Sequence, residues 1–351
     1  RFCQAGMIYR PNRQKNIEIL KRDAVNMLKN SGYDEITLSS LSTSDYQTIE
    51  ELVDFLMENF SSKKVNISLP SLRIDSVFLR LMEKLSDVKK NSVTFAPEAG
   101  SQRLRDVINK GLTVEDIMGG AGMVYEAGYN KIKCYFMIGI PTEKEDDVMA
   151  IADLAEDLAM LYYDTVPKEK RNGKCQITVS TSFFVPKPFT PFQWAGMQGE
   201  EYYVKMAKML KGKIIKTLNH KSIHYIYHEP DVTMIEGVLA RGDRRLSEVL
   251  KAVYKKGAHF DAWTEYHDNN KWREAFAETK VDPDFYTIRE RFLDEILPWD
   301  FIDCGVTKEF LTREWQTAGG ERVTPNCRER CSGCGAKKYG GGVCYESQNT
   351  V

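Results

Sequence analysis

Four of the eight cysteines lie close together near the end of the 351-residue chain. They are Cys327, Cys331, Cys334 and Cys344, and the first three have the spacing Cys-x3-Cys-x2-Cys. Thiolate sulfur is a ligand that structural zinc and iron–sulfur clusters share. In a chain of this length such cysteines favour a metal site in a reducing, cytoplasmic setting over a disulfide framework. We therefore predict a metal site here, either zinc or an iron–sulfur cluster; the alternative is a tail of unliganded thiols.

The first 230 residues alternate between β-prone runs and segments with the apolar spacing of helices. A helical period over 13–30 stops at Gly32, and a β-prone run over 35–39 follows. Further strands are predicted over 65–69, 92–96, 131–138, 176–184 and 224–228, and further helices over 48–60, 77–85, 101–109, 113–127, 146–163 and 200–218. Strands separated by such helices imply right-handed βαβ units and a parallel sheet. About six repeats without a nucleotide-binding glycine fingerprint favour a barrel, complete or partial.

The residues suited to chemistry fall where the carboxyl ends of these strands are expected. Loops at this end of a barrel carry its active site. The loops concerned are Ser39–Asp45, Pro97–Ser101 and Gly139–Glu143. Serine, glycine and proline are also ordinary turn residues, and a carboxylate such as Glu98 is favoured at a helix start. The loops alone therefore indicate a place for a site without naming its reaction.

Several longer motifs together give a specific resemblance. They are Phe2-Cys3-Gln-Ala-Gly6 with Tyr9-Arg-Pro11, Leu38-Ser-Ser-Leu-Ser-Thr-Ser-Asp-Tyr46, Phe95-Ala-Pro-Glu-Ala-Gly-Ser-Gln-Arg-Leu-Arg105 with Ile108-Asn-Lys-Gly111, Tyr135-Phe-Met-Ile-Gly-Ile-Pro-Thr-Glu143, and Phe184-Val-Pro-Lys-Pro-Phe-Thr-Pro-Phe-Gln-Trp194. The chain resembles the radical S-adenosylmethionine (SAM) superfamily, in particular the group whose core follows a cobalamin-binding-type region. Phe2-Cys3 resembles the end of that superfamily's Cys-x3-Cys-x-aromatic-Cys loop. The chain is therefore expected to be truncated inside this loop.

The resemblance implies roles for individual residues. Cys3 would be a ligand of the SAM-binding 4Fe-4S cluster, and Phe2 would lie beside the adenine. Ser39, Ser40 and Leu41 stand where many relatives have Gly-Gly-Glu, which meets the SAM amino group, so serine hydroxyls or backbone carbonyls would serve instead. The remaining implied cofactor-binding residues are Glu98 and Ser101, toward the ribose and carboxylate of SAM, and Gly139, Ile140 and Pro141, beside the adenine.

The expected fold is a partial (β/α) TIM-like barrel of the radical SAM type over 1–230, with a mainly helical extension over 231–318 and a Cys-rich tail over 319–351. The resemblance implies reductive cleavage of SAM at a 4Fe-4S cluster, which generates a 5′-deoxyadenosyl radical that attacks an unidentified substrate. It also implies a one-electron reductant such as flavodoxin or ferredoxin, and it leaves cobalamin open. With one of three cluster thiolates, this chain by itself is expected to be inactive.

Two other classes of function stay open at this point. One is a non-catalytic, barrel-like binding or assembly module with a C-terminal zinc site. The other is an ordinary barrel lyase or hydrolase, for which Glu98 and Glu143 are the obvious acid–base pair. The 49 basic and 50 acidic residues show no nucleic-acid footprint. Because no apolar run reaches the roughly 18 residues that span a bilayer, no membrane partner is expected.

Overall fold

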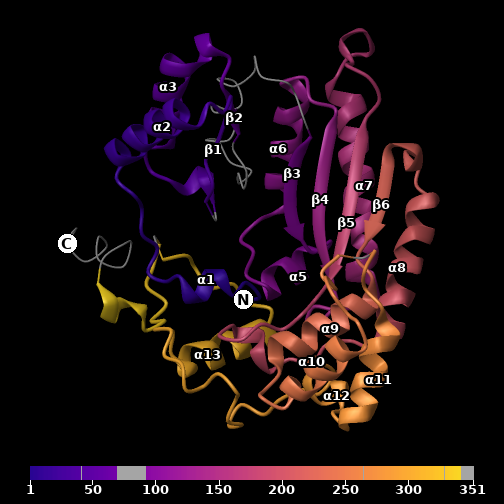
Figure 1. Cartoon of the computed structure of the whole chain (residues 1–351). Helices are drawn as coiled ribbons and strands as arrows, with labels where there is room; N and C mark the ends of the chain where they lie inside the picture. Colours follow the sequence, from indigo (N-terminus) through magenta and orange to yellow (C-terminus); the bar gives the residue numbers. More distant parts are fainter. Residues whose placement is uncertain (41, 69–91, 264, 328, 341–351) are drawn as a thin grey trace.

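The computed structural model describes residues 1–351 except 41, 69–91, 264, 328 and 341–351. Its described strands form two parallel sheets (Figure 1). The smaller sheet pairs β1 (Glu35–Thr37) with β2 (Asn66–Ser68). The larger has the order β3 (Val93–Glu98), β4 (Lys131–Ile138), β5 (Gln176–Phe183), β6 (Ile223–Tyr227). Every pair is parallel, which confirms the predicted βαβ organisation and gives a partial (β/α) barrel.

Helices connect the strands and make up most of the second half. They are α1 (Ala5–Ile8), α2 (Ile17–Ser31), α3 (Ile49–Phe60), α5 (Gln102–Val107), α6 (Val114–Glu126), α7 (Glu145–Thr165), α8 (Glu200–Ile215), α9 (Pro230–Arg241), α10 (Leu246–Lys255), α11 (Asn269–Thr279), α12 (Pro283–Tyr286) and α13 (Lys308–Gly319). Short 3-10 turns lie at Thr43–Asp45, Ser61–Lys63, Lys168–Lys170, Pro191–Trp194, His220–Ser222 and Ala336–Tyr339. The extension after β6 is helical, as predicted. The predicted helix over 77–85 lies outside the described residues.

The main core lies between the larger sheet and the helices α6, α7 and α8 (Figure 1). Strand β4 shows why it forms: its alternate residues Ile132, Cys134, Phe136 and Ile138 are each at most 1% exposed. This period of two places one face of the strand in the core. A separate, smaller core joins α2 and α3 to β1 and β2. No helix in the described ranges is long and apolar enough to cross a membrane.

Local signals in the sequence set several helix ends. Asn16 caps α2 by accepting a hydrogen bond from the Glu18 backbone at 2.9 Å, and Gly32 ends this helix with φ of 71°. Thr113 and Asp116 form a capping box at the start of α6. These contacts satisfy backbone groups that have no partner inside the helix. The stop signal that the sequence gives at Gly32 is thus confirmed.

A close backbone approach fixes the loop after β3. A side chain at Gly100 would begin 2.4 Å from the Ile151 nitrogen and 2.7 Å from the Asp147 carbonyl oxygen, both in α7. Only a residue without Cβ allows this contact. The loop that carries Glu98 and Ser101 is therefore held directly against the α7 backbone.

We expect Gly100→Ala to lower the free energy of unfolding by roughly 2–3 kcal/mol, because the added carbon meets backbone that must shift. Urea denaturation followed by circular dichroism measures this change. Gly212→Ala is the matched control: Gly212 lies inside α8 with nothing within 4 Å of its added carbon. The control substitution is expected to stabilise by about 0.5–1 kcal/mol. Equal effects of the two substitutions would contradict the tight loop contact.

Candidate functional site

Glu98 ends β3 in an unusual backbone conformation. Its φ is 68°, and the pairing of β3 with β4 shifts register between Phe95 and Glu98. Its carboxylate accepts a hydrogen bond from Lys110 Nζ at 3.2 Å. Burial raises the pKa of Glu98, and the nearby Lys110 opposes this rise. A strained residue with a shifted pKa at a strand end is typical of functional sites.

Ser101 has a structural task in this arrangement. Its hydroxyl accepts a hydrogen bond from the Leu104 backbone at 3.2 Å, which caps α5, and donates to Asp147 Oδ1 at 2.5 Å. Arg103 forms an ion pair with the same carboxylate. Ser101 thus ties α5 to α7, and its predicted contact with SAM stays a prediction.

The loop after β4 is built around a buried carboxyl group. Glu143 Oε1 accepts hydrogen bonds from the Gly139 backbone at 2.7 Å and from the Tyr202 hydroxyl at 3.0 Å. Gly139 has φ of 91°, and a Cβ there would lie 2.7 Å from the Tyr203 ring. Burial raises the pKa of Glu143 to about 8. Glu143 therefore orients the loop that carries Ile140, and its partners differ from those of Glu98.

The N-terminal segment meets two of these loops. Phe2 packs against a buried cluster that contains Ala99 from the loop after β3 and Ile140 from the loop after β4. The neighbouring Cys3 is exposed, and its Sγ lies 3.9 Å from where a side chain on Gly6 would begin. Phe2 and Ile140, both predicted to lie beside adenine, are thus brought together.

A cavity of about 790 Å³ lies beside the N-terminal segment, which lines it with residues that include Ala5, Gly6 and Arg10. Its lining includes Ser39 and Ser40 after β1, Gly6 beside Cys3, and the tail residues Cys327 and Cys334. Glu98, Ser101 and Gly139–Pro141 are not part of this lining. This cavity is therefore lined by Ser39 and Ser40 but not by the predicted SAM contacts after β3 and β4. Leu41 lies outside the described residues.

The tail cysteines differ in exposure. Cys327 is half-buried, Cys331 exposed and Cys334 buried. Burial raises the pKa of Cys327, and the charge of Arg10 opposes this rise. Among the residues that the structure describes, no three histidine, cysteine, aspartate or glutamate side chains are arranged to hold a metal ion. Cys344 lies beyond the described part of the tail, and the four-cysteine site stays a prediction.

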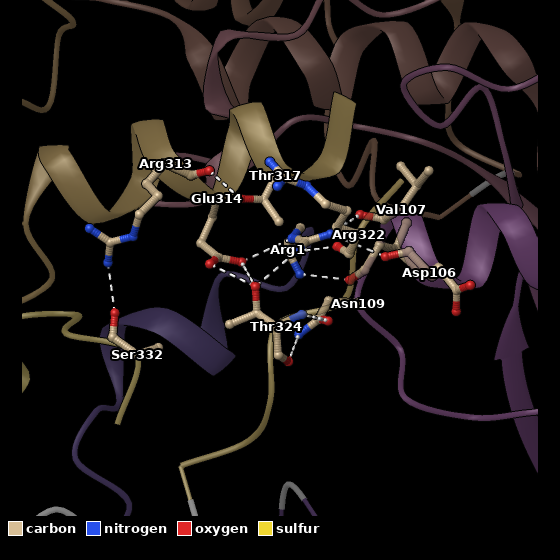
Figure 2. Close-up of polar contacts among 11 residues, drawn as sticks. Arg1, Asp106, Val107, Asn109, Arg313, Glu314, Thr317, Arg322, Thr324 and Ser332 are labelled. Carbon is tan, nitrogen blue, oxygen red and sulfur yellow. Dashed lines mark hydrogen bonds and ion pairs between the residues drawn. The ribbon is translucent and has the colours of Figure 1, made fainter. Parts of the chain in front are cut away.

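A polar network that the sequence did not reveal joins the N-terminus to the tail (Figure 2). The Arg1 side chain donates to Glu314 at 3.0 Å, to the carbonyls of Asp106, Val107 and Arg322, and to the Thr324 hydroxyl. Arg1 and Glu314 are 313 positions apart, so no local pattern could predict this contact. Asn109, which donates a hydrogen bond to the Thr324 carbonyl oxygen, belongs to the motif Ile108-Asn-Lys-Gly111 that contributes to the resemblance.

Comparison with known proteins identifies the first part of the chain. Residues 1–155 match the profile described as Radical SAM superfamily. They belong to this superfamily. The match runs from the Cys3 segment through β4 into α7, and so includes Glu98 and the Gly139 loop.

A curated relative extends the match farther along the chain. The chain is 34% identical over 250 residues to the uncharacterized protein MJ0966 of Methanocaldococcus jannaschii, which is 71% of this chain and 51% of the relative. The chain thus spans about half the length of this relative. Radical SAM proteins in general use SAM and a 4Fe-4S cluster bound by thiolates. In this radical SAM domain, the exposed thiol of Cys3 fits the chemistry of such a ligand.

The buried carboxyl group of Glu143 predicts a pH dependence of stability. Its pKa in the folded protein is about 8, against 4.5 when exposed, so the folded state binds more protons between these values. Stability is therefore lost as pH rises from about 4.5 to about 8, by at most about 1.4 kcal/mol per pH unit. Glu143→Gln keeps the acceptor oxygen and removes this dependence. Urea unfolding at pH 5.5–8.5 should show the wild type losing stability relative to Glu143→Gln; parallel curves would mean that Glu143 is ionised throughout.

Proposed function

We propose that this chain supplies the radical SAM core of an enzyme that cleaves SAM reductively. The observation that carries the proposal is the placement of the Phe2-Cys3 pair. The Cys3 thiol is exposed, while Phe2 packs on the loops after β3 and β4. A cluster ligand at Cys3 would thus adjoin the strand ends where parallel βα folds place their chemistry. The superfamily match over residues 1–155 supports this assignment.

Each residue at the strand ends then has a proposed task. Phe2 and Ile140 offer apolar surface to the adenine, and Gly139 lets backbone approach it closely. Glu98, held by Lys110 at 3.2 Å, is proposed to meet the ribose or carboxylate of SAM. Ser39 and Ser40, which line the cavity beside the N-terminal segment, are proposed to bind the amino group of SAM.

The cofactor supplies the chemistry that side chains lack. When bound, the cluster provides the electron that splits SAM into methionine and a 5′-deoxyadenosyl radical, which abstracts hydrogen from substrate. The part of the protein is to orient SAM and to exclude water from the radical. A one-electron donor of the flavodoxin or ferredoxin type is proposed as the partner. The seven described cysteines are all free, which agrees with a reducing compartment.

We propose a second metal at Cys327, Cys331, Cys334 and Cys344. The first three have the spacing Cys-x3-Cys-x2-Cys, and Cys327 and Cys334 both line the cavity beside the N-terminal segment. Zinc and an iron–sulfur cluster both suit four thiolates. Measuring the zinc, iron and sulfide content of the protein distinguishes these two kinds of site.

Cysteine substitutions in the native protein that carries this chain test both sites. After anaerobic purification, Cys3→Ser is expected to lower iron by about four per chain, the content of one 4Fe-4S cluster. It should also abolish the change that SAM causes in the paramagnetic resonance signal of the reduced cluster. Cys331→Ser is expected to lower total metal while the SAM-induced change persists. Iron, sulfide and zinc are measured beside the spectra.

Cys304→Ser is the matched control, because Cys304 is half-buried and belongs to neither cysteine group. It should leave both metals in place. Zinc alone in the native protein, with no iron, would instead favour a binding module with a zinc site. Loss of the SAM-induced change in Cys331→Ser would show that the two cysteine groups have been assigned to the wrong metal sites.

A further inference from the structure

The tail that carries the cysteines is attached to the radical SAM core by a two-point hydrogen bond. The Asn109 side-chain amide donates to the Thr324 carbonyl oxygen at 3.0 Å, and its oxygen accepts from the Thr324 backbone nitrogen at 2.8 Å. The amide thus pairs with the backbone as a neighbouring strand would. Asn109 has φ of 56°, a conformation that asparagine and glycine adopt most readily. Three residues after Thr324 the chain reaches Cys327.

Glu314 joins the same point of the tail to the segment of Cys3. Its carboxylate accepts from Arg1 Nε at 3.0 Å and from the Thr324 hydroxyl at 2.9 Å (Figure 2). The side chains of Arg1 and Glu314 are only 1% and 6% exposed. Only Phe2 lies between Arg1 and Cys3 in the sequence. One carboxylate on α13 therefore holds both cysteine-bearing segments.

A second attachment of the tail follows Cys327 and Cys331 along the chain. The Thr307 backbone donates to the Cys334 carbonyl oxygen at 3.0 Å, and Arg313 donates to the Ser332 carbonyl oxygen at 2.7 Å. Arg313 belongs to α13, and Thr307 caps its start. The tail is thus tied to α13 on both sides of Cys327 and Cys331.

Between these attachments the tail borders the cavity that the N-terminal segment also lines. Cys327 and Cys334 belong to this lining, as does Gly6, beside which the Cys3 thiol lies. The Arg10 guanidinium lies 5.3 Å above the Phe310 ring of α13, and Arg10 lines the same cavity as Cys327. The tail thus lines this cavity with two of its cysteines, and the N-terminal segment lines it with residues close to Cys3.

We propose that Asn109 and Glu314 are positioning residues that hold the tail with Cys327 and Cys334 beside the Cys3 segment, at the cavity that both segments line. This inference rests on the proposed function for the identity of the metals. The placement itself rests on contacts among protein groups and does not depend on which metal binds.

Hydrogen–deuterium exchange of the native protein tests the placement without activity. Asn109→Gly keeps the backbone conformation and removes both bonds to Thr324. Amides of residues 320–330 should then exchange at least about tenfold faster, while residues 131–138 of β4 stay unchanged as the internal reference. Lys280→Gly is the matched control, since Lys280 also has φ of 56° and lies at the exposed end of α11. This control should leave the tail unchanged.

Glu314→Ala should speed exchange in residues 1–9 and in residues 320–330 together, and Glu314→Gln should restore much of the protection. Should Glu314→Ala fail to fold, Thr324→Val takes its place and Thr324→Ser is the conservative rescue. Exchange within twofold of the wild type in both segments would overturn the proposal. So would an equal rise in β4 in every variant, because the network would then support the whole fold.

Metal analysis of the same variants separates this proposal from the proposed function. Asn109→Gly should lower the tail metal at least twofold while the SAM-induced change in the spectrum remains, and Lys280→Gly should alter neither. Faster exchange in a protein that holds no iron would sustain the positioning role and reject the radical SAM function. If the protein holds iron and responds to SAM, but amide exchange in Asn109→Gly equals that of the wild type, the radical SAM function would be sustained and the positioning role rejected.

Discussion

The buried ion pair of Arg1 and Glu314 is the contact on which the arrangement around the cysteines depends. An ion pair removed from water recovers its desolvation cost only when its remaining donors and acceptors are also bonded. Here the Arg1 guanidinium donates to three backbone carbonyls and one hydroxyl besides Glu314. These partners come from α5, α13 and the tail, so satisfying one cation brings three distant parts of the chain together. The Asn109 amide then fixes the tail at the same point.

A similar constraint governs the loops after β3 and β4. At both places a half-buried glutamate lies beside backbone in a left-handed conformation: Glu98 itself has φ of 68°, and Glu143 accepts from Gly139, whose φ is 91°. Each carboxyl group has its own donor, Lys110 for Glu98 and the Gly139 backbone for Glu143. The two carboxyl groups thus belong to separate hydrogen-bond networks, one on each loop.

The sequence predicted what depends on local pattern. The strand over 131–138 and the helix stop at Gly32 follow from neighbouring residues, and both appear in the structure as expected. Ser101 was identified as polar and near a strand end, but its bond to Asp147 depends on how α7 packs against the loop. The contact of Arg1 with Glu314 joins residues 313 positions apart and leaves no periodic signal at all. Long-range polar contacts of this kind therefore could not be predicted from the sequence.

The placement of α13 explains how one helix affects two cysteine groups. Its buried Glu314 faces Arg1, its Phe310 lies beneath Arg10, and its Arg313 binds the tail at Ser332. Positive side chains from the N-terminal segment thus meet the same helix that binds the tail. One helix therefore contacts both cysteine-bearing segments, through Arg1 and Arg10 on one and through Ser332 on the other.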